Sequence, residues 1–326
     1  AHKPCSFLFV ETTILHSDMH QYARVNMEST LFSILCILRI SLAAESFHWG
    51  YHGVSGPSYW VQHYKDCAGN MQSPIDIPRE EEVEYAENLG FIEFYGYDDV
   101  RVHKIKNNGH SLQVDVSGDS YIAGGGLEGL YKVSQLHFHW GVTSDSGSEH
   151  TIHGKAFPME MHIVHYKEEY GSIIDAIGYS DGLAVLSFMF EVSPFDHFYY
   201  SKFLGKLSDV IYSGESTNTS LMRLSEMLPI YWQNLDYFRY SGSLTTPPCR
   251  EDVIWTLFTR PIYISEEQLQ YFRNLYSIKK PSMPGTYGYM SDNYRPIQPL
   301  NDRLVLKNFQ YSLDVLDQDE NTFDSD

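Results

Sequence analysis

Ser134-Gln135-Leu136-His137-Phe138-His139-Trp140-Gly141 has the composition of a β-strand, because β-branched and aromatic residues lie within it or just upstream and a glycine ends it. Side chains alternate between the two faces of a strand. Gln135, His137 and His139 therefore share one face, whereas Leu136, Phe138 and Trp140 share the other, which is a core face. The two imidazoles lie about 7 Å apart along the strand, a spacing that lets both reach one metal ion.

A third imidazole comes from residues 158–166, Pro-Met-Glu-Met-His-Ile-Val-His-Tyr. On a strand, Glu160, His162 and Val164 share a face, so the carboxylate can orient the imidazole of His162. Three histidines without a fourth protein ligand are the composition of a catalytic zinc site whose open position holds water. A His-x-His motif alone is more often a pair of ordinary core or surface histidines. The partners Glu160 and Gln135 favour the metal site here.

The length, composition and net charge of the chain limit the kind of protein it can be. The chain has 326 residues, 43% of them hydrophobic, so it can form one large domain or two around a sizeable core. The 25 Tyr and 18 Phe suit a large sheet. The net charge of −19 argues against nucleic acid as a partner, because binding to phosphates needs a basic surface.

The first residues resemble a targeting segment. Met27 precedes an apolar run over residues 31–42 and the small residues Ala43 and Ala44, which predicts a secretory signal peptide cleaved near Ala44. The run is too short to span a membrane. An amphipathic or disordered N-terminal arm is the alternative. Residues 1–44 are therefore predicted to be an upstream segment plus a signal peptide, and the protein to be secreted and extracellular.

Four cysteines are present, and Cys5 and Cys36 fall in the predicted leader. The remaining pair, Cys67 and Cys249, suggests a single disulfide in an extracellular domain. The sequon Asn218-Thr219-Ser220 offers a glycosylation site at Asn218.

The body, residues 45–310, shows no repeat or linker and reads as one domain. Its N-terminal part, 47–78, is rich in turn residues and reads as an irregular arm. Strands are predicted over 111–116, 131–140, 160–166, 183–192 and 252–261. The strand over 183–192 is apolar on both faces, so it should be central.

Two helices are predicted. One covers 200–212, and the other begins at the capping box Ser265-Glu266-Glu267-Gln268 with Leu269, Phe272 and Tyr276 facing inward. Residues 311–326 are acidic and are expected to be a disordered tail. No apolar C-terminal segment follows them, so no membrane anchor is expected.

Six motifs together carry a family resemblance. They are residues 135–140 (QLHFHW), 147–151 (GSEHT), 160–165 (EMHIVH), 181–185 (DGLAV), 242–248 (GSLTTPP) and 292–300 (DNYRPIQPL). In this order, over about residues 47–309, the chain resembles the α-class carbonic anhydrases. The resemblance implies an α+β, mainly β fold, with a single domain around a large, mostly antiparallel twisted β-sheet and peripheral short helices. It also implies zinc-dependent reversible hydration of CO2 to bicarbonate and a proton. The positions of Cys67 and Cys249 resemble those of the secreted members of the family.

The resemblance assigns a role to each site residue. His137, His139 and His162 correspond to the zinc ligands, oriented by the Gln135 side chain, the Glu160 carboxylate and the backbone of Asn293. Three neutral imidazoles leave the metal its full +2 charge, which lowers the pKa of a bound water to about 7. Thr245 corresponds to a hydroxyl that donates a hydrogen bond to Glu149 and accepts one from the nucleophile. Taken alone, its Thr-Thr-Pro-Pro context is more often an ordinary turn.

A small apolar substrate such as CO2 needs an apolar wall. By resemblance, the wall and substrate-contacting residues are Val164, Val185, Leu244, Thr246, Val253 and Trp255, although each taken singly reads as core packing. His110 corresponds to the proton shuttle, with a surface histidine in a glycine-containing turn as the alternative. His150 corresponds to a buried structural histidine.

Two rival functions remain at this level. One is a catalytically inactive relative that serves as a binding or matrix module, and the other is an acidic extracellular matrix protein in mineral deposition that keeps the activity. Inactive relatives typically lose a ligand histidine, which this chain does not. The expected partner is a small-molecule substrate, CO2 or bicarbonate, and the sequence does not indicate an oligomeric state.

Overall fold

A large sheet dominates the computed structural model, which describes residues 47–281 and 288–310. Contacts divide the chain into Ala1–His48 and Trp49–Asp326, and every element described below belongs to the second unit. The predicted signal peptide and the predicted acidic tail fall outside the described residues. Within the part that is described, no helix is long and apolar enough to cross a bilayer.

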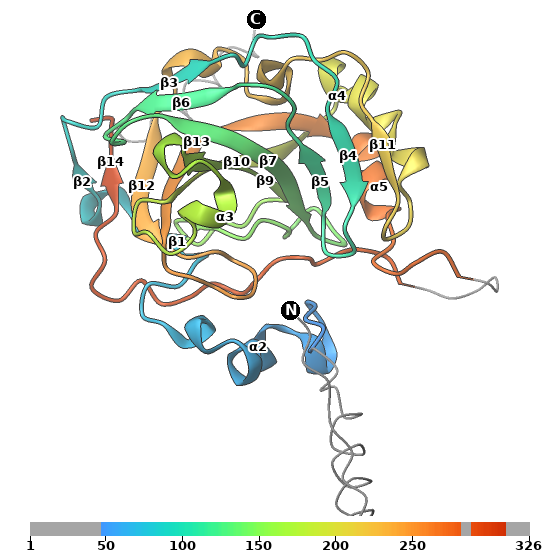
Figure 1. Cartoon of the computed structure of the whole chain (residues 1–326), viewed down its shortest axis with the longest axis horizontal. Helices are drawn as coiled ribbons and strands as arrows, with labels where there is room; N and C mark the ends of the chain where they lie inside the picture. Colours follow the sequence, from blue (N-terminus) through green and yellow to red (C-terminus); the bar gives the residue numbers. More distant parts are fainter. Residues whose placement is uncertain (1–46, 282–287, 311–326) are drawn as a thin grey trace, which may run out of the picture. The chain divides into compact units, whose positions relative to one another are not determined.

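Twelve strands of the described chain form one sheet, in the order β11-β4-β5-β7-β9-β10-β13-β12-β14-β2, with β6 pairing both β3 and β7 (Figure 1). β1 and β8 pair separately. The strands are β1 (Asp76–Ile77), β2 (Glu84–Tyr85), β3 (Ile92–Tyr95), β4 (Lys104–Asn107), β5 (Leu112–Asp115), β6 (Tyr121–Gly124), β7 (Tyr131–Trp140), β8 (Thr151–Ile152), β9 (Met159–Lys167), β10 (Leu183–Ser193), β11 (Ser216–Asn218), β12 (Tyr237–Gly242), β13 (Val253–Ser265) and β14 (Leu306–Lys307).

Most neighbours in this sheet are antiparallel, as predicted. The exceptions are β10 with β13 and β14 with β2, which run parallel. β10 lies between β9 and β13, and its residues from Leu183 to Phe190 are all buried. The prediction of a central strand, made from its two apolar faces, is therefore confirmed.

A bulge in β7 explains why residues of both odd and even number on this strand face the same core cluster. Its register against β9 shifts between Val133 and Gln135. The shift brings Tyr131 and Val133 into the same core cluster as Leu136, Phe138 and Trp140, although the two groups differ in parity. Beyond the bulge, Gln135, His137 and His139 share the opposite face.

Short helices lie between the strands. The α-helices are α2 (Pro57–His63), α3 (Ile173–Ala176), α4 (Phe198–Leu204) and α5 (Glu266–Arg273); the 3-10 helices are η1 (Gly53–Ser55), η2 (Lys65–Ala68), η3 (Glu80–Glu82), η4 (Glu168–Tyr170), η5 (Leu207–Asp209), η6 (Leu224–Met227) and η7 (Trp232–Asn234).

The helix predictions are partly confirmed. α5 begins with the predicted capping box, and Leu269 and Phe272 are buried, but it ends before Tyr276, which instead forms an isolated bridge with Tyr289. The helix predicted over 200–212 is wrong in extent, because α4 ends before Gly205. Glycine disfavours a helix, and the apolar residues beyond it are buried in a 3-10 turn and loop.

The arm predicted to be irregular contains a helix. α2 begins with Pro57 at a position where proline is favoured, and its Trp60 is fully buried. The indole nitrogen of Trp60 donates to the carbonyls of Gly50 and Ser55, which fixes the local conformation of the arm. The prediction missed α2 because seven residues give too short a periodic pattern.

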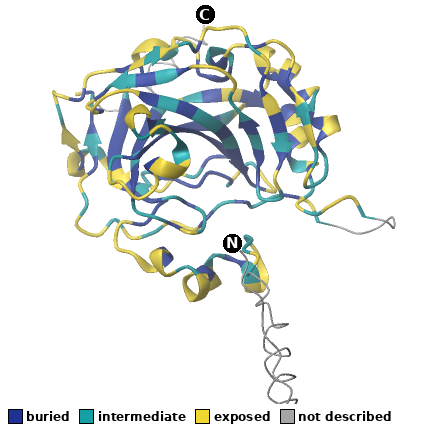
Figure 2. Cartoon of the chain, in the orientation of Figure 1, coloured by how far each residue is buried: buried dark blue, intermediate teal, exposed yellow. Residues whose placement is uncertain are grey.

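Buried residues follow the strands of the large sheet (Figure 2), and the buried apolar residues form two clusters. The larger one includes the core face of β7, with Phe138, and residues of α4 and α5. The smaller one includes Val164, Val185, Val253 and Trp255. Because Val164 and Ile163 are neighbours on β9 but belong to different clusters, the clusters cover opposite faces of the sheet.

Candidate active site

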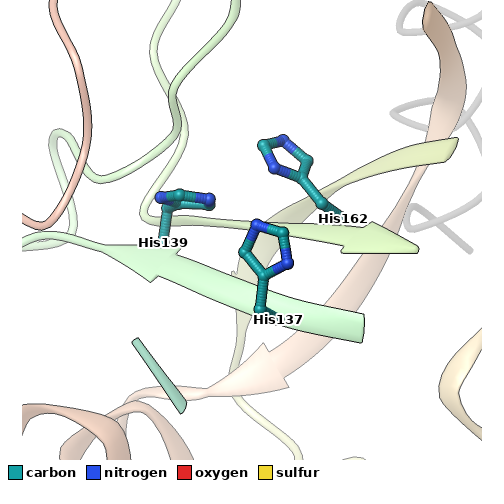
Figure 3. A group of neighbouring side chains, drawn as sticks. All are labelled: His137, His139 and His162. Carbon is teal, nitrogen blue, oxygen red and sulfur yellow. The ribbon is translucent and has the colours of Figure 1, made fainter. Parts of the chain in front are cut away.

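Strand pairing brings the three predicted ligands together. β7 and β9 are antiparallel neighbours, and their register places His137 directly opposite His162 and His139 opposite Glu160. One ring nitrogen from each of His137, His139 and His162 lies within 4.8 Å of the others. Figure 3 shows the three rings on one side of the two strands, directed toward one another.

An oxygen acceptor fixes the tautomer of each ring. Nδ1 of His137 donates to Oε1 of Gln135 at 2.9 Å, and Nδ1 of His139 donates to the carbonyl of Asn293 at 2.7 Å. Nε2 of His162 donates to Oε1 of Glu160 at 2.6 Å. Because these oxygens only accept, the lone pairs remain on Nε2 of the first two rings and Nδ1 of the third.

The free nitrogens fit a metal ion. Nε2 of His139 is buried and has no hydrogen-bond partner, which is costly unless a ligand occupies the space before it. Burial lowers the pKa of all three imidazoles, that of His139 to about 3, so the rings are neutral. Three neutral, pre-oriented imidazoles are the donor set of a catalytic zinc site.

Glu160 is the most heavily bonded carboxylate of the site. Its Oε1 also accepts from the Ser187 hydroxyl and His150 Nδ1, and its Oε2 accepts from the backbone N–H groups of Glu149 and His150. Although burial opposes ionisation, His150 and His162 hold the pKa of Glu160 well below its usual range. His150 also lies 2.6 Å from the Tyr240 hydroxyl, an arrangement suited to a structural role.

Glu149 lies at the edge of the histidine cluster. Its Oε2 is 3.4 Å from Nε2 of His139, and its Oε1 accepts from the backbone N–H of Arg295 at 2.8 Å. Burial raises the pKa of Glu149 well above its usual range, while the Thr245 hydroxyl and the Arg295 N–H act in the opposite direction. A cation held by the imidazoles would act in the same direction as these two donors.

The residues predicted to form the apolar wall converge beside the histidines. Val164, Val185, Val253 and Trp255 are buried in one cluster, against which the partly buried Leu244 packs. The ring centroid of Trp255 lies 4.8 Å from that of His162. Thr246 is half-buried in the following turn, where its carbonyl accepts from the N–H of Cys249.

His110 lies in the Asn-Asn-Gly turn that precedes β5. Its backbone N–H donates to Oδ1 of Asn108, and its carbonyl accepts from Nδ2 of Asn293, the residue that orients His139. Its half-buried ring stacks on Trp49, with the centroids 3.7 Å apart. The prediction missed Trp49, which lies just beyond the predicted leader.

The turn that carries Thr245 is anchored to the N-terminal arm. The predicted disulfide between Cys67 and Cys249 is present in the structure. Beside it, Nε2 of Gln72 donates to the carbonyl of Cys249 at 3.1 Å. Oε1 of Gln72 accepts from the guanidinium of Arg295, which also donates to the Ser73 and Cys67 carbonyls.

Gln72 and Arg295 were not predicted. Arg295 was within reach of prediction because it belongs to the quoted 292–300 motif. Gln72 lies in a segment of turn residues that gave no signal.

Comparison with known proteins agrees with this geometry. Residues 55–309 match the sequence model of the family described as eukaryotic-type carbonic anhydrase. Carbonic anhydrase 4 of Oryctolagus cuniculus is 38% identical over 285 residues, covering 85% of this chain and 90% of that protein. Carbonic anhydrase 12 of Homo sapiens is 37% identical, and the match covers 80% of this chain and 73% of that protein. Carbonic anhydrase 7 of Mus musculus is 38% identical, and the match covers 80% of this chain and 97% of that protein. The chain belongs to the eukaryotic-type carbonic anhydrase family, as its motifs predicted.

Proposed function

We propose that this protein catalyses the reversible hydration of CO2 to bicarbonate and a proton, with zinc held by Nε2 of His137, Nε2 of His139 and Nδ1 of His162. The observation that carries the proposal is the convergence of three neutral imidazole nitrogens, one of them buried without a hydrogen-bond partner. When bound, zinc lowers the pKa of a coordinated water to about 7 and so supplies a nucleophile at neutral pH.

Thr245 and Glu149 select and orient the group that reacts. A hydroxyl has one proton, so a Thr245 hydroxyl that donates to ionised Glu149 can only accept from whatever lies on its other side. It therefore favours groups that carry a proton and directs their free lone pair toward the substrate. The N–H of Arg295, 2.8 Å from Glu149, supports the ionised form.

The apolar wall holds CO2 and excludes competing polar ligands. Val164, Val185, Val253 and Trp255 present apolar surface beside the histidines, with Leu244 and Thr246 at its edge. The small side chains at Val164 and Val185 leave room that a bulkier side chain would fill. His110 receives the proton through bridging water and passes it to buffer, a role that suits a histidine because an unperturbed imidazole has a pKa of about 6.5, close to that of a zinc-bound water.

The setting that we propose is extracellular. The Cys67–Cys249 disulfide is typical of oxidising compartments. Asn218 is exposed on β11, so it is accessible to a glycan. Secreted protein should lose mass on treatment with an N-glycosidase, and Ser220→Ala, which destroys the sequon, should abolish that loss; an unchanged mass for both would refute the modification.

Stopped-flow measurement of CO2 hydration tests the proposed activity. The purified protein should accelerate hydration, a chelator should abolish the activity, and added zinc should restore it. His162→Ala should remove the activity, whereas His63→Ala, an exposed histidine in α2, should keep it. Zinc-loaded wild-type protein without activity would contradict the proposal and favour an inactive binding module instead.

A further inference from the structure

Large apolar side chains gather on the surface away from the histidines. Phe195, Phe198, Ile230 and Tyr231 are 78%, 68%, 71% and 77% exposed. They belong to two segments, 193–199, which runs from the end of β10 into α4, and 228–232, which runs into the start of η7. Isolated exposed apolar residues are normal, but a cluster of them marks an interaction site.

A groove lies along these segments. Its volume is about 770 Å³, and its apolar lining includes Phe195, Phe198, Tyr199, Ile230, Trp232 and Tyr263. Tyr199 and Tyr263 are themselves 43% and 46% exposed. We call this region the aromatic groove.

The aromatic groove is separate from the candidate active site. Val185 of the apolar wall lies near the start of β10, whereas Ser193, the last residue of that strand, lines the groove. At about 3.3 Å per residue, the two positions are roughly 25 Å apart. The catalytic proposal therefore gives this surface no role.

We propose that the aromatic groove is a homodimer interface, in which a second copy of this chain packs across a two-fold axis. A two-fold interface uses the same patch on both copies, so the patch must be complementary to itself. Here exposed aromatic side chains stand beside a hollow, so the protruding rings of one copy can fill the groove of the other.

The exposed area suits a stable dimer. An aromatic side chain offers about 150–250 Å². At the exposed fractions above, the six side chains Phe195, Phe198, Tyr199, Ile230, Tyr231 and Tyr263 present on the order of 700 Å². A standard interface buries about 800 Å² per partner, so these six nearly supply one.

The charges around the groove are mostly acidic. Arg223 lines it but pairs with Glu226 of the same chain at 3.3 Å, and Asp98 and Asp196 add two further acids, so like charges of the two copies repel each other at this rim. The net charge of −19 opposes self-association at long range. Salt screens that repulsion and leaves apolar contacts intact, so the dimer should be at least as stable at high salt.

Analytical ultracentrifugation of the full chain tests the proposal. Over about 1–100 μM, wild-type protein should show a reversible monomer–dimer equilibrium that tightens or stays unchanged from low to high salt. Phe198→Asp and Ile230→Asp should each weaken it by at least ~100-fold, because each change occurs twice in a two-fold interface. Both variants should keep CO2 hydration, which shows that they fold.

Ile174→Asp is the matched control, since Ile174 is 79% exposed in α3 and contributes nothing to the groove. It should leave dimerisation unchanged. Three results would overturn the proposal: wild-type protein that stays monomeric throughout, a dimer that survives both groove substitutions, or a dimer that dissociates as salt rises.

Discussion

Each ligand histidine has its tautomer set by one nearby oxygen. Gln135, Asn293 and Glu160 each accept a hydrogen bond from one ring N–H and leave the opposite ring nitrogen with its lone pair free. Removing any of these acceptors would leave the histidine but free its ring to rotate, which is why such partners usually affect metal affinity. The strand pattern predicted two of these partners, and the third followed only from the family resemblance, because Asn293 is 154 residues from His139.

His110→Ala should slow proton transfer without affecting the attack on CO2. We expect kcat to fall on the order of 10- to 100-fold while kcat/KM stays nearly unchanged, and added imidazole buffer to restore part of the loss. His63→Ala is the control and should change neither parameter. An equal fall in kcat/KM, or no response to buffer, would make His110 a pocket residue.

His165 should make the fold sensitive to acid. It is fully buried between the Tyr97 hydroxyl and the Ala184 carbonyl, and burial lowers its pKa from 6.5 to about 3. Between these values the unfolded chain binds more protons than the folded one, so stability falls as pH drops below 6.5. One pH unit below 6.5 costs on the order of 1 kcal/mol.

Urea unfolding of wild-type protein and His165→Gln at pH 8 and pH 5.5 measures this effect. The substitution should remove about 1 kcal/mol of the difference between the two pH values, because glutamine does not titrate. If both proteins lost the same stability on acidification, the titration of His165 would not contribute.

At the scale of elements, the alternation of side chains along strands predicted the structure better than the periodicity of apolar residues along helices did. The faces of β7 and β9 followed from the order of their residues, and pairing then placed the histidines together. The bulge at Ser134 gave no sequence signal, because it depends on the register with β9. The spacing of the apolar residues Leu207 and Val210 resembled the stripe of an amphipathic helix. Both are buried, but α4 ends before Gly205 and does not reach them.

The disulfide joins two distant elements and should matter for stability and for catalysis. It closes a loop of 182 residues, which in the chain-entropy account contributes about 5 kcal/mol, with measured values often smaller. The double change Cys67→Ala with Cys249→Ala should lower the free energy of unfolding by roughly 2–5 kcal/mol. It should also lower kcat/KM, because the turn that carries Thr245 loses its anchor.

Denaturant unfolding and bound zinc measured on the same samples separate these effects. Zinc content should be unchanged, since the imidazole ligands and their partners lie on other segments. Unaltered stability, or peptide mapping of secreted wild-type protein that finds Cys67 and Cys249 as free thiols, would contradict this account.

At the scale of the whole molecule, the family follows from the motifs and is confirmed by its relatives. The site that we propose needs segments from residue 67 to residue 295, brought together by the sheet and by Arg295, Gln72 and the disulfide. The aromatic groove could not be predicted from sequence, because exposed and buried aromatic residues look alike until the chain is folded. It lies at the end of β10 away from the apolar wall, so association there would leave catalysis unchanged.

The central claim is that three imidazoles hold one catalytic zinc ion. Metal analysis of the purified protein, dialysed against metal-free buffer and then loaded with zinc, tests it most directly. We expect one zinc per chain in wild-type protein and in His63→Ala, and none retained in His162→Ala, whose folding is checked by circular dichroism. A folded His162→Ala protein that retained one zinc per chain would show that the metal lies elsewhere, and wild-type protein that bound none would contradict the metal site itself.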